Sequence, residues 1–488
     1  MSYTEEETPL LGVRKTSTAQ LLAEEMLLLT KRAIPASTGY MLQNSIPTVS
    51  IAIVSLHGDD LALSAAAHGY MIALVTGWVV ALGGSTALDT LAAAAFTRAQ
   101  TNPNKHARKA ELKQVGVLLQ RAVVLLLALF ACMALLWIWS ESILLALGQP
   151  RALAALVQQF LRVLVGGAPG YIAFECIKKF CQVQGDMLSS TLVLVAMLPV
   201  NVLLNVALVQ GLGFGLLGSP MAVSLVYYLS AGLLILYVGT IGRTTTRQAW
   251  GGWTWHALDW HGVIQFYRLA IPGILMVGTE WIAFEIVALL AARCNDSAMA
   301  AQSVIMTMDQ VLNALPFGLG VASSSRLGNL LGMRSCDLRL LRISAQAAPA
   351  VATVMGLLAG TVLLFVRRPI GQLFSDTEAT IDLVANVLPL VAAFQVFDGW
   401  AGSCGGVLRG MGRQHLGANC NLVAYYVVAL PLGYWLAFHT DLAQGLYGLW
   451  TGQVVALGLV GAGEYVAVTW GTDWDEQHRR ANARADPL

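Results

Sequence analysis

The stretch Arg268–Arg293, RLAIPGILMVGTEWIAFEIVALLAAR, decides the fold class of this chain. Between its two arginines it is long enough to cross a bilayer, which takes about 20 apolar residues in a helix. The ionisable residues in that interval are Glu280 and Glu285. A charged carboxylate inside a membrane costs about 3 kcal/mol or more, so such acids usually face a bundle interior or a watery cavity. The stretch therefore predicts a membrane-spanning helix that carries functional acids.

The two glutamates are five residues apart, which places them about 140° apart around a helix. We therefore expect that they do not both face one cavity squarely. Glu280 lies nearer the middle of the span and precedes Trp281. We assign Glu280 the inward, proton-titrating role, with Glu285 in support and Trp281 as a cavity residue. The alternative for each acid is a structural bond to a neighbouring helix.

The composition of the whole chain indicates a polytopic membrane protein. It is 56% hydrophobic and 12% charged, against about 25% charged residues in soluble domains. A net charge of +1 argues against a nucleic-acid partner. Seven cysteines without a CxxC pair indicate neither a disulfide framework nor a zinc site, and we expect no cofactor. The polar, acidic N-terminal stretch does not resemble a cleavable signal peptide.

Twelve apolar runs predict an all-α integral membrane protein with twelve transmembrane helices in two sets of six. The runs lie near residues 35–56, 62–84, 115–139, 153–177, 187–210, 216–241, 266–292, 298–322, 341–366, 381–406, 416–438 and 446–470. We expect five segments, namely a tail over 1–30, a first half over 31–241, a linker over 242–265, a second half over 266–470 and a tail over 471–488.

The two halves are related in sequence. Pro35 ends the motif RAIP and Pro272 ends RLAIP, 237 residues later, while GLLG at Gly215 and GLYG at Gly445 are 230 residues apart. Nearly equal offsets at both ends of a half indicate a duplication. Because each half has an even number of spans, the repeat is parallel, and transporters of this kind bind substrate near the membrane midplane.

Basic residues in the loops predict the orientation, since cytoplasmic loops are rich in lysine and arginine. The loops that follow spans two, eight and ten, and the residues before span one, carry this excess: Lys31, Arg32, Arg98, Lys105, Arg108, Lys109, Lys113, Arg326, Arg334, Arg339, Arg342, Arg409 and Arg413. The opposite loops carry Asp59, Asp60, Asp296 and Asp441. We therefore expect both termini to be cytosolic.

Three longer motifs carry a family resemblance. They are IPGILMVGTEWIAFE over Ile271–Glu285, PFGLGVASSSRLGNLLG over Pro316–Gly332, and VFDGWAGSCGGVLRGMGRQHLGANCNLVAYYVVALPLG over Val396–Gly433. Together they resemble the eukaryotic branch of the multidrug and toxic compound extrusion (MATE) transporters, from about Ile34 to Trp470. The third motif is the most specific, because its elements occur in one fixed order.

The resemblance implies two pseudo-symmetric six-helix lobes in a V, alternating access, and export of organic cations or metabolites in exchange for protons. It also implies that Glu280 and Asp398 are the acids of a cavity in the second lobe. The residues support this in part, because Asp398 lies in an apolar span beside glycines, where a helix can bend. The alternative for Asp398 is a structural bond at a kink. Tyr425 and Tyr426 are cavity candidates or ordinary packed aromatics.

Two departures from the family pattern limit what is transferred. Leu88–Arg98 lacks the expected glycine and glutamine, so it receives no borrowed role. In span eight the position that carries a glutamate in animal relatives falls near Thr307, to which we carry no binding role. Asp309, two residues on, is an intramembrane acid and is a candidate in its own right, against an equally weighted structural bond.

The first half differs from the second at the position of Glu280. Under the offset of 237 residues, Glu280 corresponds to Gln43, a further cavity candidate, so we expect proton coupling through the second half alone. Glu175 is followed by Lys178 at helix spacing, which favours an ion pair. Asp89 is expected to be structural, near Arg98. Glu464 has no obvious local partner, so its role stays open.

The sequence favours a proton-coupled exporter of small molecules that acts as a monomer in the plasma or vacuolar membrane. Sodium coupling and vacuolar metabolite transport on the same fold remain alternatives. A membrane-embedded transferase is the least favoured class, because paired Asp-rich motifs are missing and the histidines are scattered. No Walker-type loop suggests an ATP-driven pump. An acidic-dileucine pattern at Glu6, Leu10 and Leu11 is a candidate sorting signal.

Overall fold

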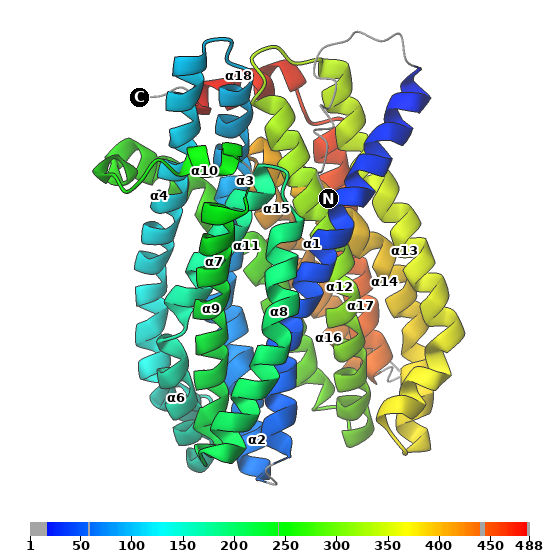
Figure 1. Cartoon of the computed structure of the whole chain (residues 1–488). Helices are drawn as coiled ribbons and strands as arrows, with labels where there is room; N and C mark the ends of the chain where they lie inside the picture. Colours follow the sequence, from blue (N-terminus) through cyan, green and yellow to red (C-terminus); the bar gives the residue numbers. More distant parts are fainter. Residues whose placement is uncertain (1–16, 57–58, 243, 440–444, 486–488) are drawn as a thin grey trace.

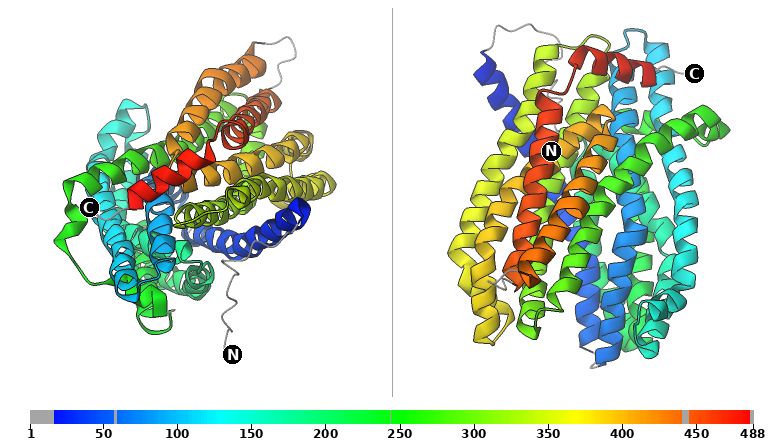
Figure 2. Two further views of the ribbon diagram at one scale, coloured as in Figure 1. Left: turned by 90° about the horizontal axis from the view of Figure 1, so that it is seen from above. Right: turned by 180° about the vertical axis from the view of Figure 1, so that it is seen from behind.

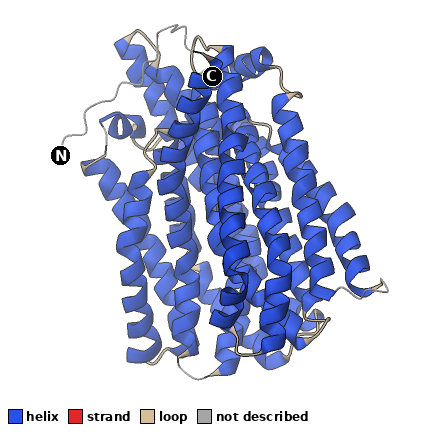
Figure 3. Ribbon diagram, turned by 90° about the vertical axis from the view of Figure 1, so that its right-hand side faces the viewer, coloured by secondary structure: helices blue, strands red, loops and turns tan. Residues whose placement is uncertain are grey.

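The computed structural model describes residues 17–56, 59–242, 244–439 and 445–485. Within these ranges every regular element is a helix, and no strand occurs (Figure 3). The long helices run side by side as a bundle (Figure 1). The all-α membrane fold expected from the sequence is thereby confirmed.

The first half contains six spans. They are α1 (Thr18–Ser55), α2 with the π-helical η1 and α3 (Asp60–Ile72, Ala73–Trp78 and Val79–Gln100), α4 (Lys105–Ile138), α6 with α7 (Arg151–Val165 and Ala168–Val183), α8 with η2 (Leu188–Asn205 and Val206–Gly211), and η3 with α9 (Gly215–Leu217 and Gly218–Thr240). A short α5 (Ser140–Ala146) joins α4 to α6.

The second half repeats the arrangement. Its spans are α11 (Trp260–Ala291), α12 (Asp296–Leu331), α13 (Leu338–Phe374), α14 (Glu378–Met411), α15 with η5 and α16 (Gln414–Asn421, Leu422–Ala429 and Leu430–Phe438), and α17 (Gly445–Thr469). The connection between the halves forms α10 (Thr244–Trp250) and η4 (Trp255–Leu258). The chain continues after α17 into α18 (Trp474–Ala485).

Ten of these spans are long and apolar enough to cross a membrane by themselves, within the described ranges. An eleventh is the pair α6 and α7, which is bent by 51°. The bend falls at Gly166 and Gly167, with Pro169 in the first turn of α7. The twelfth is α1, whose polar residues lower its hydropathy although it runs through the bundle (Figure 1).

The first helix of each half packs against the other half. Helix α1 lies against α8 of its own half and against α12 and α13 of the second, while α11 lies against α3 of the first half. Seen from above, most helices of the two halves lie on opposite sides (Figure 2, left). This reciprocal exchange is what a parallel repeat about an axis along the membrane normal produces.

The first helix begins earlier than the apolar run suggests. Ser17 caps α1 and Gln20 completes a capping box, so residues 18–30, expected to belong to a solvated tail, are helical. Glu25 in this stretch is buried and pairs with Arg326 of α12, with Nη2 2.5 Å from Oε1. Glu6, Leu10 and Leu11 of the candidate sorting signal lie outside the described residues.

The basic loops gather at one end of the bundle, which we call the basic end. It comprises the start of α1, the α3–α4 and α12–α13 connections, and α18 (Figure 1). Arg334 bonds to Glu111 at 2.7 Å and Arg339 to the Thr18 hydroxyl at 2.6 Å, which ties these segments together. Asp59 lies at the opposite end, where it caps α2.

The two halves meet closely at the basic end. Thr97 of α3 donates to Asn329 of α12 at 3.0 Å. Gly328 and Gly332 of α12 lie against the backbone of α3, where an added Cβ would clash, for example at 2.5 Å from the Asp89 carbonyl oxygen. Thr90 donates to the carbonyl of Arg409 at 2.5 Å. These contacts close the basic end.

Helix α18 lies across this closure. Arg98 of α3 donates to the carbonyl of Asn482 at 2.7 Å, and Arg484 donates to the carbonyl of Met411 in α14 at 2.9 Å. The segment expected as a tail is therefore a helix that contacts both halves.

Candidate functional site

Two cavities meet at Glu280 in the middle of α11. The first, which we call the inter-lobe cavity, lies between α1, α2 and η1 of the first half and α11 and α12 of the second. Its lining comes from the parts of these helices that lie away from the basic end. It contains Glu280, Glu285 and Asp309 together with aromatic side chains such as Tyr70, Trp78, Trp281 and Phe284.

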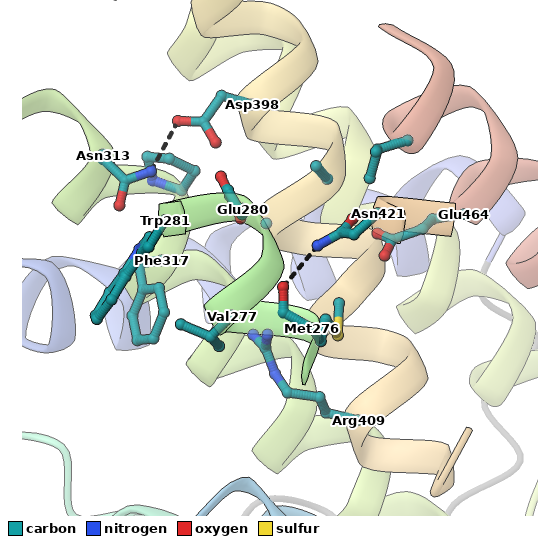
Figure 4. Close-up of a pocket in the computed structure, with 14 residues that line it drawn as sticks. Met276, Val277, Glu280, Trp281, Asn313, Phe317, Asp398, Arg409, Asn421 and Glu464 are labelled. Atoms are coloured by element: carbon teal, nitrogen blue, oxygen red, sulfur yellow. Dashed lines mark hydrogen bonds between the residues drawn. The ribbon is translucent and has the colours of Figure 1, made fainter. Parts of the chain in front are cut away.

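The second cavity, which we call the C-lobe pocket, lies inside the second half (Figure 4). Its lining combines charged, polar, aromatic and small apolar residues: Met276, Val277, Glu280, Trp281, Asn313, Pro316, Phe317, Asp398, Ala401, Gly402, Arg409, Asn421, Val460 and Glu464. Glu280, Trp281 and Asn313 line both cavities. Glu280 is therefore placed to exchange with either one.

A close approach of α12 and α14 fixes the position of Asp398, which lines the same pocket as Glu280 of α11. Gly402, one turn after Asp398 on α14, lies against Pro316 of α12, where an added Cβ would be 2.8 Å from the proline carbonyl oxygen. Asn313 of α12 donates its amide to Asp398 Oδ2 at 3.3 Å. Asp398 itself is only 3% exposed. The small residues predicted to allow close packing thus bring this acid into the C-lobe pocket.

Asp309 lies on the inter-lobe side of the same region. It is 7% exposed and accepts a long hydrogen bond of 3.5 Å from Gln395 of α14. It lines the inter-lobe cavity with Glu280. Thr307, which received no binding role, is exposed and bonds to the backbone of Ser303 in its own helix.

Arg409 brings a positive charge to the C-lobe pocket. It is 4% exposed, and its guanidinium carbon lies 5.9 Å from the centre of the Phe317 ring. No acid is in ion-pair contact with it among the described residues, and its Nε has no hydrogen-bond partner there. One cation therefore faces three pocket acids, Glu280, Asp398 and Glu464, without pairing with any of them.

Glu464 of α17 is the site residue that the sequence left undecided. It is fully buried, and neither carboxylate oxygen accepts a hydrogen bond from another side chain within the described part of the chain. It lines the C-lobe pocket opposite Trp281 (Figure 4). An ionisable side chain in an apolar span with no partner at helix spacing was the available signal.

Glu280 and Glu285 border the same cavity, although they project about 140° apart around the helix. Both line the inter-lobe cavity, and Glu285 lies more than one turn beyond Glu280 along α11. The reason is that α11 stands at the boundary between the halves, so the cavity borders a wide arc of its surface. Trp281 lies between them and lines both cavities, as a cavity residue should.

Gln43 lies in a buried network instead. Its amide donates to Glu175 Oε1 at 2.7 Å and to the Tyr171 hydroxyl at 3.1 Å, and accepts from Lys178 at 2.8 Å. Lys178 also pairs with Glu175 at 2.7 Å, the contact that their spacing predicted. Gln43 is 5% exposed, and it is not among the residues that line the inter-lobe cavity or the C-lobe pocket.

Asp89 is structural, but its partner is not Arg98. It pairs with Lys179 of α7 at 3.0 Å, and both side chains are buried. Arg98 instead reaches α18. The pairing joins residues 90 positions apart, which spacing along one helix does not reveal.

The two tyrosines have different surroundings. Tyr425 is fully buried beside Phe284, with ring centroids 6.4 Å apart, and its hydroxyl has no partner among the described residues. Tyr426 donates its hydroxyl to the Thr279 carbonyl at 3.0 Å, one residue before Glu280. Neither is among the residues that line the two cavities. Tyr426 instead forms its hydrogen bond with the α11 backbone next to Glu280.

The described residues contain no group of three or more His, Cys, Asp or Glu side chains arranged to hold a metal ion. The chemistry available at this site is therefore that of carboxylates, one guanidinium, amides and aromatic rings.

Comparisons with known proteins agree on one family. The MatE family model matches residues 35–207 and 272–435, once in each half. Multidrug and toxin extrusion protein 2 from Mus musculus is 34% identical over 459 residues, which cover 93% of this chain and 76% of the mouse protein. An uncharacterized transporter from Schizosaccharomyces pombe is 32% identical over 479 residues, covering 98% of this chain and 85% of the other.

The solved structures give the same result. The eukaryotic MATE transporter AtDTX14 superimposes with a TM-score of 0.86 and 27% identity, over 96% of this chain and all of the other. The Vibrio cholerae MATE transporter VcmN in the bent form matches with a TM-score of 0.76 at 16% identity, which shows a common fold.

Proposed function

Because this chain belongs to the MATE family and is therefore a membrane transporter, we propose that it is a secondary active antiporter that exports organic cations or polar metabolites in exchange for protons. The observation that carries the proposal is the position of Glu280, which borders both the inter-lobe cavity and the C-lobe pocket. A single carboxylate there is able to meet substrate from one cavity and protons from the other.

The chemistry of the inter-lobe cavity suits a cation. Its acids attract positive charge, and aromatic rings bind cations over their faces. Trp281 and Phe284 lie in the same helix as Glu280 and Glu285, so both kinds of contact are available to one bound molecule. The name of the mouse relative, multidrug and toxin extrusion protein 2, agrees with substrates of this class.

Exchange at Glu280 follows from the two states of a carboxyl group. The deprotonated acid attracts a cation, and the protonated acid does not, so a proton that arrives releases the substrate and a substrate that arrives releases the proton. Asp398 and Asp309 lie close enough to Glu280 for the charge on one acid to repel charge on the others. Proton binding to the three acids is therefore mutually dependent. We assign Glu285 a supporting role at the entrance.

Alternating access would require the closed basic end to open as the inter-lobe cavity closes. Rocking of the two halves about the reciprocal contacts of α1 and α11 provides this motion, as in other transporters built from repeats. By the positive-inside rule we place the basic end, and with it both termini, in the cytosol of the plasma or vacuolar membrane. Since one chain encloses both cavities, we propose that the protein acts as a monomer.

Purified protein in liposomes tests the proposal. With an imposed pH gradient, a fluorescent organic cation such as ethidium should move against the protons in wild type, and Glu280→Gln should abolish that movement while leaving folding intact. Glu378→Gln, an exposed acid far from both cavities, is the matched control and should transport normally.

Three outcomes separate the alternatives. Normal exchange by Glu280→Gln would remove this acid from the mechanism. Movement driven by a sodium gradient alone would replace protons by sodium as the coupling ion. No movement of ethidium under either gradient would contradict organic-cation exchange and direct the search to neutral or anionic metabolites.

A further inference from the structure

Glu464 is an unpaired acid in the interior of the second half. It lies on α17, is 0% exposed, and neither of its carboxylate oxygens accepts a hydrogen bond from another side chain in the described ranges. A carboxylate buried in this way is costly as an unpaired charge. Such a carboxyl group is expected to bind a proton or another ligand, and the residues around it determine which of these fits.

The space that holds the Glu464 carboxyl group is bordered by glycines on two other helices. An added Cβ at Gly405 of α14 would lie 3.2 Å from Oε2, and one at Gly417 of α15 would lie 2.8 Å from Oε1. The Met276 methyl group of α11 fills the space between them. The glycines leave room for the carboxyl group and supply no side-chain donor to it.

Glycines and Met276 surround the Glu464 carboxyl group closely, which leaves no room for an organic molecule beside it. The carboxyl group nevertheless borders the same pocket as Glu280. Glu464 lines the C-lobe pocket with Glu280, Asp398 and Arg409 (Figure 4). Asn421, also in this lining, donates its amide to the Met276 carbonyl at 2.6 Å, and its amide oxygen is unpartnered within the described part of the chain. Polar atoms therefore run from Glu280 to Glu464 through one pocket.

The titratable groups around Glu464 come from several helices. Arg409 and Cys404 lie on α14, Glu280 on α11, Cys420 on α15 and Tyr425 on η5. Arg409 carries the positive charge among them, and it forms no ion pair with Glu464 in the described structure. A structural salt bridge therefore does not account for this acid.

We propose that Glu464 is a further proton-binding carboxyl group of the exchange cycle, supplied through the C-lobe pocket from Glu280. The inference rests on the proposed proton-coupled function and extends it. While the pocket faces the proton source, the O–H bond of protonated Glu280 breaks as one forms on Glu464, and Glu280 takes another proton from water. When the pocket faces the cytosol, the O–H bond of Glu464 breaks and its proton leaves to water, so the exchange ratio rises by one proton for each substrate molecule.

The exchange ratio is measurable from the point of zero net flux. In liposomes whose membrane potential is held at zero, a gradient of one pH unit balances about a tenfold concentration ratio of substrate for each proton exchanged. With ethidium as the probe, the balancing ratio in Glu464→Gln should be about tenfold smaller than in wild type. Glu464→Asp, which keeps the carboxyl group, should retain the wild-type ratio, as should the surface control Glu378→Gln.

The outcomes distinguish the two proposals. If wild type shows no proton-driven flux, the proposed function fails, and this inference fails with it. If wild type is proton-driven but Glu464→Gln balances at the same ratio, proton binding by Glu464 in the cycle is excluded while the proposed function stands.

A second measurement decides the question if Glu464→Gln does not fold. Infrared spectra recorded across a pH titration should show the carbonyl band of a protonated carboxylic acid in wild type, and Glu464→Asp should shift that band. A band that is unchanged in Glu464→Asp would overturn the proposal.

Discussion

The two halves of the molecule bury charge in opposite ways. In the first half, Glu175 and Asp89 each place one oxygen within 3.0 Å of a lysine, Lys178 and Lys179 respectively. In the second half, Glu280, Asp309, Asp398 and Glu464 surround or adjoin one pocket, and none of them has an ion pair in the described structure. The first half thus holds these buried acids in ion pairs, and the second half holds four buried or cavity-lining acids without one in the described structure.

The difference teaches that pairing, more than burial, separates structural charges from exchangeable ones. A paired acid keeps its charge because its partner would otherwise be left alone in the low-dielectric interior. An unpaired acid is free to gain or lose a proton, and its neighbours change affinity when it does. Four variants test this contrast, beginning with the largest expected effect.

The largest effect is expected from Asp398→Asn. The substitution removes an acid from the C-lobe pocket but keeps a side chain that fits beside Asn313, so folding should survive while proton-driven ethidium exchange falls to the background of empty liposomes. Exchange and thermal unfolding of the same preparation measure the two consequences. Exchange that persists at the wild-type rate would show that Asp398 is structural.

Lys178→Ala tests the paired half. It leaves Glu175 buried without its cation, and breaking a buried ion pair by removing one partner costs about 3–5 kcal/mol. The midpoint of thermal unfolding in detergent should drop clearly, and Lys109→Ala, an exposed lysine at the basic end, is the matched control. The pair Glu175→Gln with Lys178→Met should recover most of the loss, and failure to recover would mean that packing, not charge, was removed.

Gln43→Ala is expected to have a smaller effect on stability and none on coupling. The ion pair of Glu175 with Lys178 remains, but the hydrogen bonds of the amide are lost, at a cost of about 1–3 kcal/mol. The pH dependence of ethidium exchange should match wild type, because Gln43 faces the network and not the cavities. A lost pH dependence would place proton coupling in the first half as well and so contradict the contrast.

Arg368→Ala should have the smallest effect. Arg368 pairs with Glu378 and, at 3.2 Å, with Asp382, but all three side chains are more than half exposed. Exposed pairs contribute about 0.2–1 kcal/mol. Thermal unfolding should therefore stay close to wild type. A decrease in the unfolding midpoint as large as that of Lys178→Ala would show that the burial of an ion pair does not determine how much stability its removal costs.

The sequence predicted most of the fold because hydropathy reports directly on which segments cross a membrane. It placed the helix ends less well, as in α1, which begins at Thr18. Helices continue past the lipid where polar residues still bond to other helices, as Glu25 does to Arg326. Contacts of this kind join residues about 300 positions apart, so no local pattern reveals them.

The candidate site was predictable where an acid stands out within its own span. Glu280 and Asp309 were proposed in this way, Asp398 was proposed from the family resemblance, and the pairing of Glu175 with Lys178 followed from helix spacing. The partner of Asp89 and the surroundings of Glu464 were not, because they depend on how separate helices pack. The position of Gln43 shows the same limit, since an offset between repeats gives the matching residue but not the direction of its side chain.

Helix α18 has a consequence for finding the natural substrate. Arg98 of the first half donates a hydrogen bond to the Asn482 carbonyl of α18, and Arg484 of α18 donates one to the Met411 carbonyl of the second half, so the proposed opening of the basic end would release α18 from at least one half. One dye on α18 and another on the half it leaves would change their separation once in every cycle. Such a labelled protein would count turnovers without a labelled substrate, and unmodified compounds from a metabolite library could be tested directly for their ability to drive the cycle.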